Sequence, residues 1–536
     1  MGSLLLVNGQ IHTQDPACAG ATAVAIRDGR FLAVGGDEVR AAAGPGARVI
    51  DLGGRRVLPG LTDAHFHYYD WALGRQRVSL TGVPSLADLQ ARVAAAVRAA
   101  APGAWILGLN WNENEWSERR LPARDALDQV APDHPVLLWR TGLHLALVNS
   151  EALRRAGIGP GHTDPPMGVI DKDAAGRPTG ILRDLAINLV TARVPDRSDT
   201  EVARAFQDGF GILNRIGLTG IQDQRLMGAP EGAQAFRVWQ ALRAEGASTL
   251  RVWMNLPGER LEEAIALGLR TGMGDDCLRV GHCKYFADGA QGVHSAWMLE
   301  PYADEPTTGL PLTPMDAIED ALRKANAAGL AISVHAIGDR ANRELSLVFQ
   351  RVLEQGLPSQ VPPLAPHRIE HMQLIHPEDL ARVSRLGVAS SVQPMSVTDD
   401  IPMMAPTIGP RTCFAHAWRS MLDAGVLLAF GSDCPVSDPN PFKGIHAAVT
   451  RRRANGSPRE GWHPEQRITL EEAVWAYSMG PAKVTGRDRN QGSISPGKLA
   501  DLVVPDQDIL TIDPMAIQEV KPALTVFGGQ VVFEAM

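Results

Sequence analysis

Short apolar runs alternate with helical patterns through most of the chain. The helical patterns cover residues 200–216, 316–328 and 377–386, among others, and eight apolar runs of strand length lie around them. Strands that alternate with helices predict a parallel sheet in an α/β fold, and eight such strands are the number that a (β/α)8 TIM barrel requires. The eight runs are 56–61, 217–222, 249–255, 278–286, 330–334, 367–369, 387–392 and 426–430.

The spacing of the runs is regular except at one place. About 150 residues separate the first run from the second, which is far more than one crossover connection needs. Residues 70–195 of this interval contain strand patterns at 105–109 and 135–140 and a helical pattern at 86–100. We therefore predict a long insertion after the first barrel strand, which forms a lid or wall at the catalytic end of the barrel.

The two ends of the chain have a different pattern from the middle. Residues 3–57 contain short alternating strands separated by turns such as Asn8-Gly9 and Asp28-Gly29, and residues 492–536 repeat this pattern. Two β-rich ends around an α/β middle predict one small β-sandwich domain built from both termini. The predicted boundaries are 1–57 and 489–536 for the β-sandwich and 58–488 for the barrel with its insertion.

Composition and charge exclude several classes of protein. The chain has 536 residues and a net charge of −8, which argues against a nucleic-acid-binding protein. The longest apolar run falls short of the roughly 18 residues that a membrane span needs, and the N-terminus lacks the basic segment of a signal peptide. Five scattered cysteines, an odd number, argue against a disulfide framework and favour the reducing cytoplasm.

Residues that can bind a metal follow several of the predicted barrel strands. His65 and His67 are two residues apart and face the same side of the first strand, so they can hold one ion together. His335, His371 and Asp433 follow the fifth, sixth and eighth strands. A single buried histidine is more often a hydrogen-bonded core residue, but barrel enzymes keep their catalytic groups at the carboxyl ends of different strands. Together these residues predict a metal site.

Lys284 lies within the fourth predicted strand of a chain that has only seven lysines among 52 basic residues. A lysine inside a barrel strand is costly unless its charge is paired or removed. It can form an ion pair with Asp288 or extend its amine to the rim of the barrel. Alternatively, an amine whose pKa is lowered by burial can add CO2 and become a carbamate, an anionic ligand for two metals.

These motifs resemble those of the amidohydrolase superfamily, and within it the YtcJ-like branch that includes N-substituted formamide deformylases. The resemblance covers essentially the whole chain, since residues 492–502 match the superfamily's return to the β domain and 141–150 match the branch within the insertion. The other matching segments are 59–67, 284–289, 335–341, 368–371 and 431–433.

The resemblance implies a metal-dependent hydrolase. His65, His67 and Asp433 would hold one divalent metal, normally zinc, and His335 and His371 a second. Carbamylated Lys284 would bridge the two ions. Asp433 would take a proton from the attacking water and pass it to the leaving nitrogen. We therefore expect hydrolysis of a non-peptide amide C–N bond in a small molecule, such as an N-substituted formamide or an N-acyl compound.

Other interpretations remain open at this point. A cyclic amide, lactone or imidazolone hydrolase would use the same ligands, and a barrel that has lost catalysis would keep the fold. Deamination is disfavoured, because His335 is not followed by the HxxE glutamate of deaminases. The sequence leaves open one or two metals, and His282, two residues before Lys284, is a rival ligand.

Four further residues are candidates for substrate binding. His144 lies in the branch motif of the insertion, where a histidine bonded to backbone is the alternative, and Asp288 can either tether Lys284 or contact substrate. Trp111 and Trp297 can line an apolar pocket, although tryptophans are more often core residues. We expect a small-molecule substrate as the partner, with no nucleic acid and no membrane. A homodimer is expected only because it is the commonest assembly.

Overall fold

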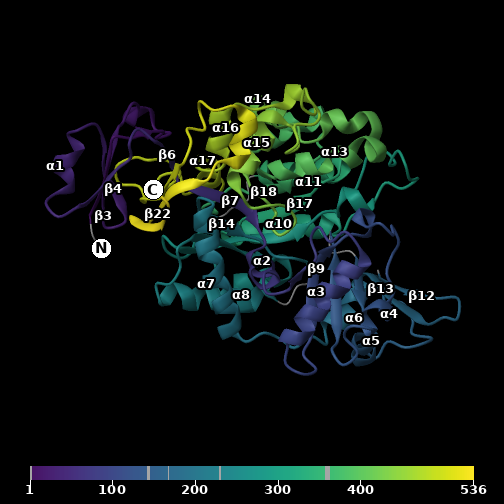
Figure 1. Cartoon of the computed structure of the whole chain (residues 1–536). Helices are drawn as coiled ribbons and strands as arrows, with labels where there is room; N and C mark the ends of the chain where they lie inside the picture. The colour runs from purple at the N-terminus through teal and green to yellow at the C-terminus, as the bar shows by residue number, and fades with distance from the viewer. Residues whose placement is uncertain (1–2, 142–144, 167, 228–230, 356–361) are drawn as a thin grey trace. The chain divides into compact units, whose positions relative to one another are not determined.

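A computed structural model describes residues 3–141, 145–166, 168–227, 231–355 and 362–536. The chain divides into two compact units, one of residues 1–68 with 207–536 and one of Tyr69–Phe206. Figure 1 shows the chain with its elements labelled. In this part of the chain, no helix combines the length and the apolar character that crossing a membrane demands.

The larger unit contains an eight-stranded parallel barrel. Adjacent strands pair in chain order from β7 to β20, and a further bridge from Phe66 to Cys434 links the two edges. Every residue of β14 and of β18 is buried, as expected for strands covered on both faces. The (β/α)8 prediction is confirmed. The barrel strands are β7 (Leu61–Phe66), β14 (Leu218–Asp223), β15 (Arg251–Pro257), β16 (Leu278–Phe286), β17 (Ile332–Ala336), β18 (Arg368–His371), β19 (Ala389–Val392) and β20 (Leu428–Phe430).

Helices follow the barrel strands and lie outside them (Figure 1). The three helices predicted between the barrel strands are present, with every bound within one residue of its prediction, as α7 (Asp199–Arg215), α10 (Met315–Ala328) and α12 (Pro377–Arg385). α10 ends where Gly329 adopts a left-handed conformation (φ 76°), the usual stop signal. The remaining helices of this unit include α8 (Glu231–Ala244), α11 (Asp339–Leu353), α13 (Pro394–Ile408), α14 (Trp418–Asp423), α15 (Pro441–Thr450), α16 (Leu470–Ala476) and α17 (Met479–Val484).

Two sheets beside the barrel bring together both ends of the chain (Figure 1). Leu6 and Ile26 from one sheet share a hydrophobic core with Val57, Leu502 and Leu524 from the other, so the pair forms the predicted β-sandwich. The first sheet contains β1 (Leu4–Val7), β3 (Ala23–Arg27), β4 (Arg30–Gly35) and β5 (Arg48–Asp51); the second contains β2 (Gln10–Ile11), β6 (Arg56–Pro59), β21 (Leu502–Pro505), β22 (Pro522–Phe527) and β23 (Gln530–Glu534).

The first apolar run, residues 56–61, contributes to two sheets, so its prediction as a single barrel strand is wrong. Residues 56–59 form β6, which pairs with β2 and β21 of the terminal sheet, and the barrel strand β7 begins only at Leu61. Gly60 stands between them, where a Cβ would lie 2.3 Å from Thr219 Oγ1. An uninterrupted apolar run does not show that the chain passes from one sheet into another at a glycine.

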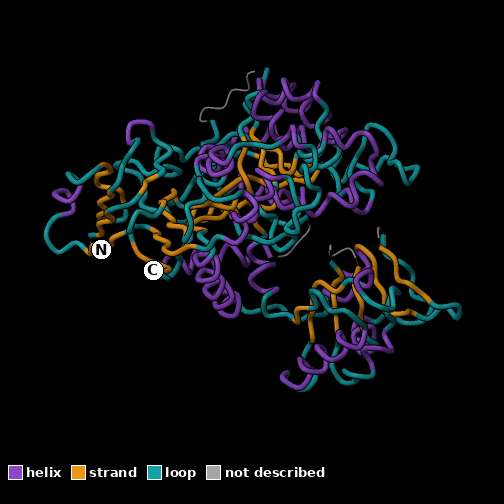
Figure 2. Tube along the Cα trace, turned by 45° about the horizontal axis from the view of Figure 1, so that its top comes forward, coloured by secondary structure: helices purple, strands orange, loops and turns teal. Residues whose placement is uncertain are grey.

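The unit Tyr69–Phe206 has a six-stranded sheet and two cores of its own. Side chains alternate along β10: Val136 and Leu138 enter one core, whereas Leu137 enters the other. Figure 2 shows its strands in orange among its purple helices. Its elements include β8 (Val78–Ser79), β9 (Ile106–Trp111), β10 (Val136–Arg140), β11 (Leu145–Val148), β12 (Gly168–Lys172), β13 (Pro178–Asp184), α3 (Leu86–Ala99), α4 (Arg124–Asp128), α5 (Ser150–Ala156) and α6 (Asn188–Thr191).

Candidate metal centre

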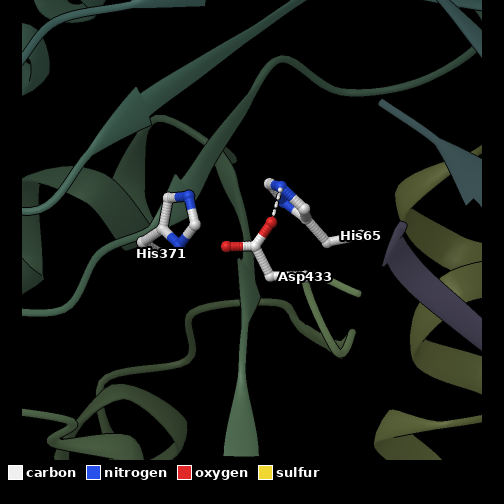
Figure 3. A group of neighbouring side chains, drawn as sticks. All are labelled: His65, His371 and Asp433. Atoms are coloured by element: carbon white, nitrogen blue, oxygen red, sulfur yellow. Dashed lines mark ion pairs between the residues drawn. The ribbon is translucent and has the colours of Figure 1, made fainter. Parts of the chain in front are cut away.

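The predicted ligands converge because their strands run in parallel. His65 is the fifth residue of β7, His335 is the fourth of β17, His371 ends β18, and Asp433 follows β20 by three residues. Parallel strands bring their carboxyl ends to one side of the barrel. Figure 3 shows the side chains of His65, His371 and Asp433 pointing toward one another.

Asp433 lies at the centre of the cluster. One ligand atom from each of His65, His371 and Asp433 lies within 4.8 Å of the others. Asp433 Oδ1 is 3.3 Å from His65 Nε2 and 3.2 Å from His67 Nε2. The His335 ring packs against the His371 ring with 4.3 Å between centroids. The structure thus brings four histidines and one carboxylate together.

Hydrogen bonds fix which nitrogen three of these rings can offer. His65 Nδ1 lies 2.7 Å from Glu370 Oε2, and His371 Nδ1 lies 2.8 Å from Gln393 Oε1. His335 is oriented the other way, with its Nε2 3.2 Å from the carbonyl oxygen of Gly289. The opposite nitrogen of each ring therefore remains available as a ligand.

Glu370 and Gln393 are the residues that sequence reasoning missed. Glu370 lies inside the segment 368–371 that was matched to the family, and Gln393 directly follows the run 387–392. Their partners lie on other strands, 305 and 22 residues away along the chain, so residue spacing did not reveal the contacts.

Lys284 is buried in the barrel without a polar partner. The residue is 3% exposed, and its Nζ makes no hydrogen bond among the described residues. The amine lies over the Phe286 ring, 5.0 Å from its centroid. Burial lowers the pKa of Lys284 to about 8, against the pull of Glu370 and Asp433. The alternative of an ion pair with Asp288 is wrong.

At Asp433, His335 and His371 the electrostatics favour the protonation states of metal ligands. At His65, burial and Lys284 act to lower the pKa, but Asp433 and Glu370 outweigh them and raise it. Burial acts to raise the pKa of Asp433, but His65 and His67 outweigh it and hold that pKa well below its usual range. Burial, followed by the charge of Lys284, lowers the pKa of His335 to about 3. Burial and the neighbouring imidazoles also hold the pKa of His371 well below its usual range. An ionised carboxylate and neutral imidazoles are the forms that bind divalent ions.

Asp288 holds the two loops that follow β16 and β17. Its carboxylate is fully buried and accepts hydrogen bonds from the backbone N–H groups of Trp297, Ile337 and Gly338, at 2.8, 2.9 and 2.8 Å. The carboxylate therefore fixes the backbone just after His335. Its predicted contact with substrate stays a prediction, as does that of Trp297, whose partly buried ring lies 4.8 Å below the Arg340 guanidinium.

His282 is not available as a rival ligand. Its Nδ1 accepts a hydrogen bond from Trp253 Nε1 at 3.0 Å, and its Nε2 lies 3.0 Å from the carbonyl oxygen of Pro366. Both nitrogens are therefore occupied by structural contacts. Burial lowers the pKa of His282 to about 3, so the ring is neutral.

The two candidates in the inserted unit have different outcomes. Trp111 is 0% exposed within a core of that unit, and its Nε1 donates to the carbonyl oxygen of Leu138 at 2.9 Å. The expected substrate contact of Trp111 is therefore wrong, because its ring and its one donor are used in the core. His144 lies outside the described residues.

Enzymes with a (β/α)8 barrel keep their catalytic groups at the carboxyl ends of the strands, and the histidines and the carboxylate of this chain meet there. The chain belongs to the amidohydrolase family, whose model matches residues 48–533. It is a hydrolase that acts on carbon–nitrogen bonds other than peptide bonds, and the family resemblance inferred from the motifs is confirmed.

Three curated relatives match most of the chain. It is 33% identical to the protein LONG AFTER FAR-RED 3 of Arabidopsis thaliana, over 94% of this chain and 87% of that protein. It is 30% identical to the putative amidohydrolase YtcJ of Bacillus subtilis, over 91% of each chain. It is 28% identical to the N-substituted formamide deformylase of Arthrobacter pascens, over 100% of this chain and 99% of that protein.

A solved structure shares the whole fold. An uncharacterized metal-dependent hydrolase from Pyrococcus horikoshii OT3 superposes with a TM-score of 0.80 at 24% identity. The match covers 96% of this chain and 99% of that one. The barrel, the terminal sheets and the inserted unit therefore occur together in another protein.

Proposed function

We propose that this chain hydrolyses the amide bond of a small molecule, such as an N-substituted formamide or an N-acyl compound. The reaction uses one or two divalent metal ions, and zinc is the metal that we propose. The observation that carries the proposal is the meeting of His65, His371 and Asp433 ligand atoms within 4.8 Å. The named activity of the Arthrobacter pascens relative supports the substrate class.

The donor set fits a divalent metal. Imidazole nitrogens and a carboxylate oxygen suit zinc, and two buried polar atoms, Lys284 Nζ and His67 Nδ1, make no hydrogen bond in the described part of the chain. We assign His65, His67 and Asp433 to a first metal position. His335 and His371 form a second position, and Lys284, as a carbamate, would serve both.

The reaction adds water across the amide. When bound, divalent ions polarise the substrate carbonyl and lower the pKa of water. Asp433 accepts a proton as the water oxygen bonds to the carbonyl carbon, and it then donates that proton to the nitrogen as the C–N bond breaks. The products are a carboxylic acid, which is formic acid for a formamide, and an amine.

Substitution of Asp433 by Asn tests the proposed proton transfer. Asn keeps an oxygen at the cluster but cannot accept the proton, so we expect kcat to fall by about 10²–10⁴-fold. Steady-state kinetics are measured together with the metal content of each preparation. Asp423→Asn, on the exposed surface of α14, is the matched control and should keep full activity. Undiminished turnover by the metal-loaded Asp433→Asn protein would reject the role of Asp433.

A substrate panel separates the leading proposal from its rival. Zinc-loaded protein is offered linear formamides and N-acyl compounds in one set, and cyclic amides, lactones and imidazolones in the other. Higher kcat/KM for the linear set supports the proposal. Turnover of the cyclic set alone would assign the same metal centre to ring opening.

We also propose a cytoplasmic location and a homodimer. Four of the cysteines, Cys18, Cys277, Cys283 and Cys413, are free thiols in the described part of the chain, which supports a reducing compartment. The dimer rests on the frequency of such assemblies alone. Size-exclusion chromatography with light scattering measures the mass in solution, and a single-chain mass would reject the dimer.

A further inference from the structure

The two proposed metal positions are supported by different kinds of neighbour. At the first position, His65 Nδ1 donates to Glu370, a fully buried carboxylate. At the second, His371 Nδ1 donates to the neutral amide oxygen of Gln393, and His335 Nε2 donates to the carbonyl oxygen of Gly289. The Asp288 carboxylate also lies near the second position, but its Oδ1 is 3.8 Å from His335 Nε2, too far for a hydrogen bond. Only the first position thus has an imidazole that is hydrogen-bonded to a carboxylate.

Glu370 is held so that its carboxylate cannot turn away from His65. Its other oxygen, Oε1, accepts a 2.5 Å hydrogen bond from Arg368 Nε and a further bond from the hydroxyl of Ser333. Arg368 in turn contacts Gln222 of β14. The carboxylate therefore joins strands β7, β17 and β18 at fixed positions, and one of its oxygens is committed to His65.

A carboxylate behind a ligating imidazole strengthens the ligand in two ways. It fixes the tautomer with the proton on Nδ1, which leaves Nε2 free to bind, and it raises the basicity of the ring. Gln393 and the Gly289 carbonyl also fix a tautomer, but they add no negative charge. The first position further contains the Asp433 carboxylate, whereas Lys284 adds negative charge to the second only after it has become a carbamate.

We propose that the two positions fill in order, the His65–His67–Asp433 position first, with Glu370 as the positioning residue that sets this order. This inference rests on the proposed metal-dependent function and deepens it. In the absence of substrate, the protein would then bind one ion tightly at the first position and one ion weakly at the second. The state with a single ion would have that ion at the first position.

Titration of the metal-free full-length protein with Zn²⁺ or Co²⁺ in bicarbonate buffer tests the order. Calorimetry and chelator competition measure the affinities, and the visible absorption of Co²⁺ reports the ligands in each phase. We expect two phases. His67→Ala should remove the tight phase, and His335→Ala should remove the weak one.

A matched pair of variants tests the positioning roles. In Glu370→Gln, one of the two carboxylate oxygens is replaced by an NH2 group. This NH2 group faces either Arg368 or His65 Nδ1, both of which are donors, so the original contacts cannot all form. We expect the affinity of the tight phase to fall by about 10–100-fold, with the weak phase unchanged. Gln393→Met removes the acceptor of His371 and should weaken only the weak phase by a similar factor.

The outcomes separate this inference from the proposed function. Two phases of equal affinity, or loss of the tight phase in His335→Ala instead of His67→Ala, would overturn the filling order while leaving a metal enzyme. An equal weakening of both phases by Glu370→Gln would assign Glu370 a general structural role. No binding of either metal by the wild-type protein would reject the proposed function itself. Far-UV circular dichroism checks that each variant is folded, and the two histidine variants decide the order even if Glu370→Gln unfolds.

Discussion

Lys284 is the residue whose surroundings most constrain its chemistry. Its amine is buried, makes no hydrogen bond in the part of the chain that the structure describes, and lies in the same barrel as the four histidines of the centre. A permanently charged amine at that place would oppose the binding of cations. Conversion to a carbamate replaces the positive charge with a negative one and supplies oxygen ligands, which is why we favour it.

Substitution of Lys284 by Arg tests this conversion. A guanidinium keeps its charge and does not add CO2, so we expect the metal content to fall from two ions per chain to one. The affinity for the second ion should fall by at least about 10–100-fold. Elemental analysis and kinetics in buffers with and without bicarbonate provide the measurement.

A lysine on the surface supplies the control for that substitution. Lys324 in α10 pairs with Glu262 and Asp320, and Lys324→Arg keeps the charge and both partners. It should therefore leave the metal content and the dependence on bicarbonate unchanged. A Lys284→Arg protein that still binds two ions and turns over substrate would exclude the carbamate.

At the scale of elements, the ligands were predictable because they sit in short motifs at strand ends. His65, His335, His371 and Asp433 each follow an apolar run, so their convergence follows from parallel strands alone. The contacts of Glu370 and Gln393 were not predictable, since they depend on which strands are neighbours. The same reason explains the wrong assignment of residues 56–61, because a run of apolar residues does not state which sheet it joins.

One contact between neighbouring strands makes stability depend on pH. His367, just before β18, accepts a hydrogen bond at Nδ1 from the backbone N–H of Ile332 at the start of β17 (3.0 Å). Burial lowers the pKa of His367 to about 4 from 6.5, so the folded ring is neutral where the unfolded ring is charged. The unfolded state binds more protons between these values. The contribution of His367 to the free energy of unfolding is therefore fully present above pH 6.5 and is lost as the pH falls toward 4.

Substitution of His367 by Asn tests this dependence. Asn retains an acceptor near the position of Nδ1 but has no proton to gain. Residue 367 should therefore no longer add a pH dependence to the stability of the protein in this range. The difference in unfolding free energy between wild type and variant should shift by on the order of 3 kcal/mol between pH 7 and pH 4. Denaturation of metal-free protein is followed at several pH values, so that loss of metal does not contribute. A constant difference across the range would contradict the assignment.

At the scale of the whole molecule, both ends of the chain form sheets that are attached to the barrel by a buried ion pair. Arg251 at the start of β15 donates through Nε and Nη2 to Asp501, and the Asp501 carboxylate also accepts the N–H of Gly528 at 2.8 Å. Asp501 lies just before β21. The pair thus joins a barrel strand to the C-terminal strands, far from the metal centre in sequence and in the fold.

Removing one partner of this pair should destabilise the larger unit. Arg251→Met leaves the Asp501 carboxylate buried without its cation, which costs about 3–5 kcal/mol of unfolding free energy. The double variant Arg251→Met with Asp501→Leu removes both charges, and we expect it to recover much of the loss. Calorimetric unfolding of the wild type, the single variant and the double variant measures both effects. The metal affinity of each protein shows whether the barrel keeps its metal centre. A single variant as stable as the wild type would show that the pair does not hold the terminal sheets in place. Metal binding in the folded single variant should be unchanged, since Arg251 begins its strand and the ligands lie at the opposite, carboxyl ends of the barrel.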